Sequence, residues 1–363
     1  MITCRSLFTV LLLLILISQA LSASEEKFGA NFLQQLTSAE ADGVGESLAA
    51  YPIGIRSLNN NPAGLAYMEE SEFLLSTHEL PRITAVIMKV NNDGEWEDYA
   101  RYDIEPTEMG LISYALPLSR FGKLGIGFVF HHAGRFIRVD EEGKAVNSFP
   151  KDDLAFTIGY SLKIRGVSVG VDVENIRSKV PVDDSGNIGR TNAVNVGLMH
   201  QMGKRVRVGA VLQNIGGELS FNSPDIPSKL RKKWLVGAVY TVKDSENSVL
   251  SLSMDVNPPF EDGLRYGLGA ELLYAKRIAL RIGYLRDNRV YYELLSNLQD
   301  GSAAFDNRVW IREGITVGLG LRLGSVELDI ARTPRREPVL NGDEKSRLEK
   351  HDSIVSFSCS TTF

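Results

Sequence analysis

Charged residues recur inside stretches whose alternate positions are apolar. In GVSVGVDVEN (166–175), Asp172 and Glu174 stand between valines, and Arg207 has the same place in RVRVGAVLQN (205–214). Such carboxylates and guanidinium groups can pass protons or ions along a path, or they can pair with one another and stiffen an interior. The charged residues that share this pattern are Asp172, Glu174, Arg207, Asp255, Glu271, Arg281, Arg322, Glu327 and Asp329.

Other chemistry has weaker support in the sequence. No nucleophile and base have a spacing that indicates a catalytic pair, so we expect no enzyme and no cofactor. His131 and His132 are adjacent, so on a strand they point to opposite faces and cannot hold one metal ion together. DDSGN (183–187) lacks the full ligand set of a cation-binding loop, so we expect no metal site. The basic segment SKLRKKW (228–234) fits either contact with lipopolysaccharide phosphate or a solvated rim.

The elements that position the charged residues are strands with a period of two. Val167, Val169, Val171 and Val173 alternate with Gly, Ser, Asp and Glu, and ITVGLGLRLG (315–324) repeats the scheme. This pattern predicts fourteen strands near 82–90, 108–118, 122–132, 152–163, 166–178, 191–202, 205–215, 230–241, 248–257, 265–275, 277–287, 313–323, 325–333 and 352–363.

The connections between these strands alternate in length. Those at 91–107, 133–151, 179–190, 216–229, 258–264, 288–312 and 334–351 are mostly long and polar, and the others are short. Counting back from the C-terminus, all long connections fall at one end, as in outer-membrane barrels. A soluble β-sandwich also alternates apolar and polar residues, but it does not sort its loops in this way. We therefore predict an all-β, transmembrane antiparallel β-barrel of about fourteen strands, with charged residues facing the lumen because a charge facing lipid is costly.

The N-terminus predicts export. Arg5 precedes an apolar run from Leu7 to Ile17, and small residues follow up to Ala23, so residues 1–23 resemble a secretory signal peptide. Without Cys4, Cys359 is left as a single cysteine and cannot form an internal disulfide. The formal net charge of −5 gives no electrostatic reason to bind nucleic acid. We expect a location in the bacterial outer membrane, with outer-membrane lipid and the barrel assembly machinery as partners.

Residues 24–80 have no sustained alternation and are rich in glycine, alanine and asparagine. A barrel of fourteen strands has a lumen too wide for its own side chains to fill. We therefore predict that residues 24–80 form a plug or hatch inside a barrel built by residues 81–363. The last residue, Phe363, ends an alternating strand, and it resembles the terminal aromatic signal of bacterial outer-membrane barrels.

Several segments resemble the PorV/PorQ family, which is related to the FadL-type outer-membrane transporters. They are GVGESLAAY and IRSLNNNPAGLAYME in the plug, GVSVGVDVENIRSKV, NAVNVGLMHQMGKRVRVGAVLQNIGG, and LSLSMDVNPPFEDGLRYGLGAELLYAKRIALRIGY. The resemblance spans roughly residues 28–363 through the order and spacing of these segments. It departs at Glu46 and Ser47, where family members usually carry glycine and small residues.

The resemblance implies one of two functions. In FadL-type proteins an Asn-Pro-Ala hatch gates a lumen that takes long-chain fatty acids and other hydrophobic compounds. The matching residues here are Asn61, Pro62 and Ala63, followed by Gly64. This predicts passive transport or binding of a hydrophobic small molecule. The alternative is a PorV-like component of the type IX secretion system that binds secreted proteins at the cell surface.

Overall fold

The computed structural model describes residues 28–30, 32–33, 37–79, 83–90, 96–104, 108–139, 145–180, 187–221, 229–257, 264–287, 290–296, 303–334, 336–338, 346–349 and 353–363. The predicted signal peptide, the DDSGN segment up to Gly186 and parts of the long connections lie outside these residues.

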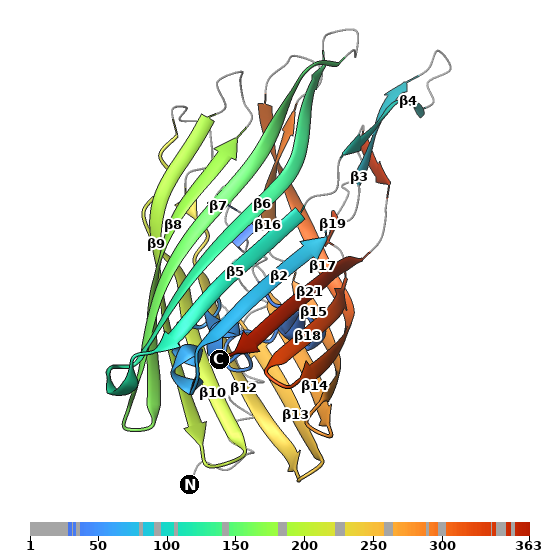
Figure 1. Cartoon of the computed structure of the whole chain (residues 1–363). Coiled ribbons are helices and arrows are strands. Elements are labelled where there is room, and N and C mark those ends of the chain that lie inside the picture. Colours follow the sequence, from blue (N-terminus) through green and yellow to red (C-terminus); the bar gives the residue numbers. More distant parts are fainter. Residues whose placement is uncertain are drawn as a thin grey trace.

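Fourteen antiparallel strands form a closed ring, which confirms the predicted β-barrel (Figure 1). In ring order they are β2 (Glu72–Glu79), β5 (Glu108–Pro117), β6 (Lys123–Val139), β7 (Ala145–Ile164), β8 (Val167–Val180), β9 (Asn187–Met202), β10 (Val206–Gly216), β12 (Lys233–Asp244), β13 (Ser248–Val256), β14 (Arg265–Tyr274), β15 (Ile278–Asp287), β17 (Ala303–Leu323), β18 (Val326–Thr333) and β21 (Ile354–Thr362). The last strand, β21, pairs with both β18 and β2. The ring therefore has no open edge at which backbone groups lack partners.

Short connections gather at the end of the barrel where β21 ends. One of them contains the short 3-10 helix η5 (Ser119–Phe121), and others are turns through Arg165–Gly166 and Gly324–Ser325. The long connections lie at the opposite end. We call these the short-turn end and the long-loop end.

The two faces of the wall are reversed relative to a water-soluble protein. Large apolar side chains are exposed on the outside, among them Leu75, Phe128, Ile158, Val173, Leu198, Ile282, Leu319, Ile330 and Phe357. Polar side chains on the inside are buried, such as Thr157, Asp172 and Ser356. Exposing this much apolar surface to water would be strongly unfavourable, so the outer face fits a lipid environment.

The structure corrects the predicted first strand. The barrel begins with β2, which lies inside the segment assigned to the plug, whereas the predicted strand at 82–90 lies outside the barrel. That stretch forms β3 (Ile83–Val90), which pairs with β4 (Trp96–Ile104) and β20 (Ser346–Glu349) in a separate three-stranded sheet. Both stretches have strand-like sequences, and pairing with β21 and β5 decides which one joins the ring.

Two predicted loops are also shorter than expected. β6 and β7 continue pairing beyond His132 as far as Val139 and Ala145, within the predicted loop 133–151. β16 (Val290–Ser296) pairs with the first part of β17, within the predicted loop 288–312. The short strand β19 (Arg336–Pro338) also pairs with β17.

The segment before β2 lies inside the barrel (Figure 1). It contains the helix α2 (Ala39–Gly43) and the 3-10 helices η3 (Gly54–Ser57) and η4 (Pro62–Tyr67). Further towards the N-terminus, β1 (Phe28–Gly29) pairs in parallel with β11 (Lys229–Leu230). We call residues 37–70 the plug. Within the described part of the chain, no helix has the length and apolar character needed to cross a membrane.

Candidate functional site

The plug is built from short helices whose ends are capped by its own side chains. Ser38 begins α2, and its Oγ accepts a hydrogen bond from the amide of Ala41 at 3.4 Å. Asn61 begins η4 in the same way, because its Oδ1 accepts from the Ala63 amide at 3.2 Å. Pro62 occupies the first turn of η4, where its fixed φ suits a helix start. The predicted hatch motif is thus the start of a 3-10 helix.

Asn61 also joins the plug to the wall. Its Nδ2 lies 2.6 Å from the Ala49 carbonyl oxygen, and 3.3 Å from the carbonyl oxygens of Leu198 on β9 and Ala210 on β10. Asn61 is fully buried. One amide side chain therefore connects two parts of the plug with two neighbouring strands.

Glycines in the middle of the strands let the plug backbone approach the wall. A Cβ added at Gly209 would collide with the Ala49 carbonyl, and one added at Gly170 would collide with the Pro62–Ala63 peptide. On the opposite wall, Gly318 lies against Gly43, with 3.0 Å between an added Cβ and the Gly43 Cα. These inward glycines are needed because a side chain would occupy the space of the plug backbone.

Three of the predicted lumen charges bind the turn that follows α2. Asp255 Oδ2 accepts hydrogen bonds from the amides of Leu48 and Ala49, the latter at 2.7 Å. Arg207 donates to the carbonyl oxygens of Ala50 and Tyr51 at 2.7 and 3.0 Å. Glu271 accepts from the Tyr51 hydroxyl at 2.7 Å. Asp255 and Arg207 thus satisfy backbone groups of the plug that have no partner in a helix or sheet, and Glu271 satisfies a buried hydroxyl.

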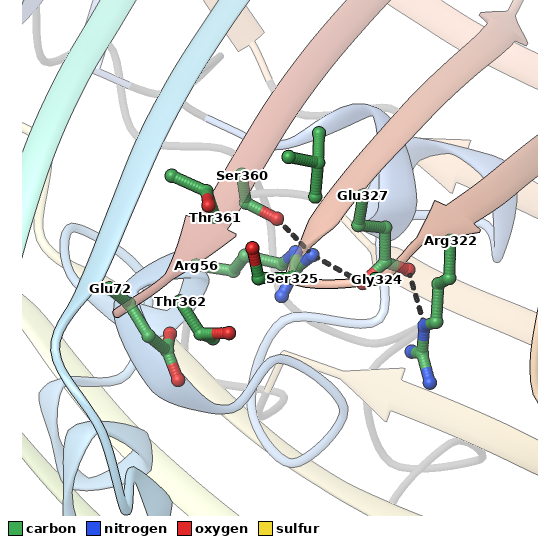
Figure 2. Close-up of a pocket in the computed structure, with 10 residues that line it drawn as sticks. Arg56, Glu72, Arg322, Gly324, Ser325, Glu327, Ser360, Thr361 and Thr362 are labelled. Atoms are coloured by element: carbon green, nitrogen blue, oxygen red, sulfur yellow. Dashed lines mark hydrogen bonds and ion pairs between the residues drawn. The ribbon is translucent and has the colours of Figure 1, made fainter.

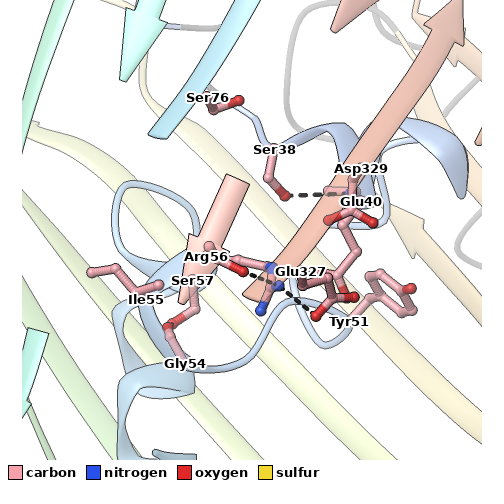
Figure 3. A network of polar contacts seen from close by, with 12 residues as sticks. Ser38, Glu40, Tyr51, Gly54, Ile55, Arg56, Ser57, Ser76, Glu327 and Asp329 are labelled. Atoms are coloured by element: carbon pink, nitrogen blue, oxygen red, sulfur yellow. Dashed lines mark hydrogen bonds and ion pairs between the residues drawn. The ribbon is translucent and has the colours of Figure 1, made fainter. Parts of the chain in front are cut away.

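Three more predicted charges, together with Glu271, form one network with the plug. Figure 3 shows the part of it that contains Glu40, Arg56, Glu327 and Asp329. Arg281 contacts Glu271 and Asp329, each at 2.6 Å, and lies 3.6 Å from Glu327. Glu327 is also 2.7 Å from Arg56 of the plug, and Arg56 in turn is 2.7 Å from Glu40 on α2. The network therefore runs from the barrel wall through two arginines to the plug helix.

Burial raises the pKa of the Glu40 carboxyl to about 7, an effect that the Arg56 charge opposes. Glu40 therefore titrates near neutral pH, while it lies in the contact between plug and wall.

Arg322 and Glu327 lie at the edge of this network, beside a pocket at the short-turn end (Figure 2). The two side chains are 3.1 Å apart. The pocket has a volume of about 210 Å³ and is also lined by Arg56, Glu72 and Ser360. Arg56 of the plug also lines this pocket, so the charge network of the plug is open to the short-turn end through it.

Asp172 and Glu174 form a second, separate group on β8. Asn195 Nδ2 donates to both carboxylates, at 2.7 and 3.1 Å, and Asn59 Nδ2 lies 3.3 Å from Glu174. Asn59 also donates to Thr157 at 2.7 Å. This group holds the η3–η4 connection through amide side chains, whereas the first network uses arginines.

Sequence reasoning missed the contacts of Glu46. Its carboxylate is 2.5 Å from Arg312 and 3.6 Å from Arg265, and its carbonyl oxygen accepts from Arg265 at 2.7 Å. Glu46 has a φ of 52°, a left-handed conformation that is unfavourable for a residue other than glycine. The available signal was the departure from the family pattern at this position, where a glycine is usual.

His78 was missed as well. Its Nε2 lies 3.1 Å from Asp42 Oδ2 and 3.1 Å from Thr37 Oγ1, and it is buried on β2. Among the described residues no group of three or more His, Cys, Asp or Glu is arranged to hold a metal ion. His131 and His132 lie on opposite faces and pair with Asp153 at 3.0 Å and with Asp152 at 2.7 Å.

An apolar cluster inside the lumen is formed by residues of the plug and of the barrel wall. We call the following residues the apolar lumen cluster: Ala30, Phe32, Leu33, Ile55, Leu58, Leu65, Met68, Leu74, Met109, Leu111, Ala115, Val129, Ala155, Ile176, Ala193, Leu219 and Leu230. Phe32 stacks on the His131 ring, with 5.9 Å between centroids and 4° between planes. The cluster shows that the lumen is not uniformly polar, although the predicted charges lie on the same inner wall.

Phe363 lies next to the point of closure. Its amide donates to the Ser71 carbonyl oxygen at 3.0 Å, and its side chain is 73% exposed. The backbone of Phe363 thus belongs to the ring, whereas its aromatic ring packs little against the rest of the chain.

Comparison with known proteins identifies the fold. No family model matches the chain, and no curated protein matches it. A FadL homologue from Pseudomonas aeruginosa has a similar structure, with 12% identity and a TM-score of 0.55 over 90% of this chain and 98% of that one. The toluene transporter TodX from Pseudomonas putida has 14% identity and a TM-score of 0.59 over 90% and 99% of the two chains. The toluene transporter TbuX from Ralstonia pickettii has 14% identity and a TM-score of 0.52 over 90% and 98%.

At these identities the likeness establishes the fold alone. The chain folds as a fourteen-stranded barrel similar to the barrels of these proteins, and membership of the PorV/PorQ family stays a prediction.

Proposed function

We propose that the protein is a FadL-like passive transporter of hydrophobic small molecules in a bacterial outer membrane. The observation that carries this proposal is the apolar lumen cluster inside a barrel whose fold is shared with hydrocarbon transporters. Contact with such a cluster buries apolar surface of a ligand, and burying a group as large as a leucine or phenylalanine side chain contributes about 1.5–3 kcal/mol to binding. The plug, held by polar contacts on either side of the cluster, is the element whose movement would open the path.

The proposed ligand class is apolar or weakly polar molecules. TodX and TbuX are described as toluene transporters, and CymD as a monoaromatic hydrocarbon channel. The resemblance to FadL-type proteins makes long-chain fatty acids the expected class. The many buried charges lie where they bind the plug, so they do not by themselves argue against an apolar ligand.

The test uses the purified full-length chain reconstituted into liposomes. The influx of toluene and of a fluorescent long-chain fatty acid is compared with the influx of a sugar. Lipid extracts of the purified protein are examined by mass spectrometry for a bound ligand. We expect protein-dependent influx of the apolar probes and none of the sugar.

A matched pair of variants connects the influx to the lumen. Val129 is fully buried in the apolar lumen cluster, whereas Val171 is exposed on the outer face. Val129→Asn should lower apolar influx about fivefold or more, and Val171→Asn should leave it unchanged if the barrel folds. Equal influx through both variants, or no influx through the native protein, contradicts the transport proposal.

The alternative is a PorV-like component of the type IX secretion system that binds secreted proteins. The observation that favours it is the three-stranded sheet β20–β3–β4, which pairs outside the barrel between segments of the long-loop end. A barrel without apolar influx that captures exported proteins from the same cells would support this function instead.

A further inference from the structure

Strands β8 and β9 lie side by side in the wall (Figure 1), and the outer face of this pair changes in character along its length. Directly opposite pairs, in order towards the long-loop end, are Val171 with Val196, Val173 with Val194, Asn175 with Asn192 and Arg177 with Arg190. The two asparagines bond to each other at 2.8 Å. The surface therefore passes from apolar side chains to amides and then to two guanidinium groups.

Arg177 and Arg190 are both exposed and directly opposite each other. Side chains in such positions have Cβ atoms about 4.5–5.5 Å apart, and like charges there are destabilising. On the other side of each arginine the directly paired residue is neutral, because Leu154 on β7 lies opposite Arg177 and Ser220 pairs with Arg190. Neither arginine forms an ion pair with another residue that the structure describes.

On the opposite wall an outward-facing arginine has a carboxylate partner. Arg286 on β15 lies directly opposite Glu313 on β17, and their charged groups are 3.6 Å apart. For Arg177, the nearest acid on the outer face of β7 is Asp152, whose carboxylate lies 2.7 Å from His132 Nδ1. An arginine pair without a carboxylate is thus specific to the β8–β9 face in the part of the barrel that is described.

We propose that Arg177 and Arg190 bind the phosphate group of an anionic lipid of the surrounding membrane. Each guanidinium can donate two parallel hydrogen bonds to phosphate, and one phosphate between them would offset their mutual repulsion. The valine pairs below would contact the acyl chains of the same lipid, and the asparagine pair lies at the level between chain and head group. This order along the strands selects a lipid over free phosphate, which would use only the arginines.

The site is independent of the proposed transport function, because it lies on the outside of the wall. The test uses the purified full-length protein in an uncharged detergent. Dioleoyl phosphatidic acid is titrated into it, and bound lipid is counted by native mass spectrometry. Dioleoylglycerol, which has the same chains and no phosphate, serves as the comparison lipid.

We expect the native protein to bind the phosphate-bearing lipid at least about tenfold more tightly than dioleoylglycerol. Arg177→Gln combined with Arg190→Gln should remove this preference. Arg286→Gln, which deletes an arginine that already has a carboxylate partner, should leave it unchanged. Replacing both arginines with lysine keeps the charge but removes the paired donors, so part of the preference should be lost.

Three results would contradict the proposed lipid site. They are equal binding by the native protein and the double glutamine variant, equal loss in Arg286→Gln, and binding of inorganic phosphate as tight as that of the lipid. The heat-dependent shift of the band on a gel reports whether each variant forms the barrel. If the double glutamine variant does not form the barrel, the single variants Arg177→Gln and Arg190→Gln replace it, and the same three results apply to them.

Discussion

At the scale of single residues, small and neutral side chains fix the plug as much as the charges do. Asn61 connects the plug to β9 and β10, and Gly209 leaves room for the Ala49 carbonyl beside β10. Both residues act on backbone groups, whose partners must be found inside a closed lumen. The charged residues Arg207 and Asp255 do the same with longer side chains.

Asn61→Ala should loosen the plug. The change removes the cap of η4 and three contacts with carbonyl oxygens, at a cost of about 1–3 kcal/mol. A Cys359→Ser, Ile53→Cys background places a reactive thiol on an exposed plug residue, and its rate of modification reports plug movement. We expect a rate about tenfold higher with Asn61→Ala.

Asn60→Ala is the control for this change. The Asn60 side chain donates to the Arg56 carbonyl oxygen, at 3.3 Å and within the plug. Its loss should change the rate much less. Equal rates for the two variants would show that the wall contacts of Asn61 do not hold the plug.

Glu40 should make the plug sensitive to pH. Its pKa is raised by burial from 4.5 to about 7, so the docked plug favours the protonated carboxyl. That contribution to docking is complete below pH 4.5 and is lost as the pH rises through about 7. The charged or titratable groups around it are Tyr51, Arg56, Glu271, Arg281 and Glu327.

The modification rate of the cysteine at position 53 measures this effect. The rate is divided by that of a small free thiol at the same pH, which corrects for ionisation of the thiol. The corrected rate should rise between pH 5 and pH 8 in the native plug, and Glu40→Gln should remove most of the rise. A pH dependence that persists unchanged in Glu40→Gln would assign it to another group.

At the scale of elements, strands and plug fit together through the register of the wall. Gly209 on β10 is paired with Gly237 on β12, and Gly269 on β14 is paired with Gly283 on β15. In each pair, two glycines lie directly opposite each other on neighbouring strands, at the depth in the barrel where the plug backbone touches the wall. The alternation in the sequence predicts that glycines share the inner face, but a glycine does not specify which backbone it faces. The partners of the plug were therefore out of reach of sequence reasoning.

Gly209→Val should displace the turn at Ala49–Ala50 while leaving the barrel closed. The new side chain would occupy the position of the Ala49 carbonyl, and valine suits a strand. Gly203→Asn is the matched control, because an added Cβ there meets no atom within 4 Å and asparagine tolerates its positive φ. Both variants should keep the heat-dependent gel shift, and only Gly209→Val should raise the rate of thiol modification at position 53. A lost gel shift in Gly209→Val would mean that the wall yields before the plug.

At the scale of the whole molecule, strand number, loop sorting and the lipid-facing side were predictable because each follows from a period of two and from closure. The identity of the first strand was not. ITAVIMKV (83–90) is the more apolar stretch, yet EFLLSTHE (72–79) supplies β2. Its Ser76 and His78 face the plug, and only the three-dimensional packing makes these polar residues suitable for a barrel strand. The plug boundary is displaced for the same reason.

Closure of the ring also separates two roles for Phe363. Its backbone amide pairs with Ser71, whereas its side chain is mostly exposed, so the side chain contributes little to the stability of the closed barrel. We expect Phe363→Ala to refold in detergent with native yield and a native gel shift, but to accumulate severalfold less in the outer membrane of cells. Leu323→Ala changes another exposed apolar residue at the short-turn end, and it should both refold and accumulate in the outer membrane like the native protein. Because refolding in detergent requires no assembly machinery, a defect confined to cells assigns the aromatic ring to recognition. Poor refolding of Phe363→Ala would assign it to packing at the closure of β2 and β21.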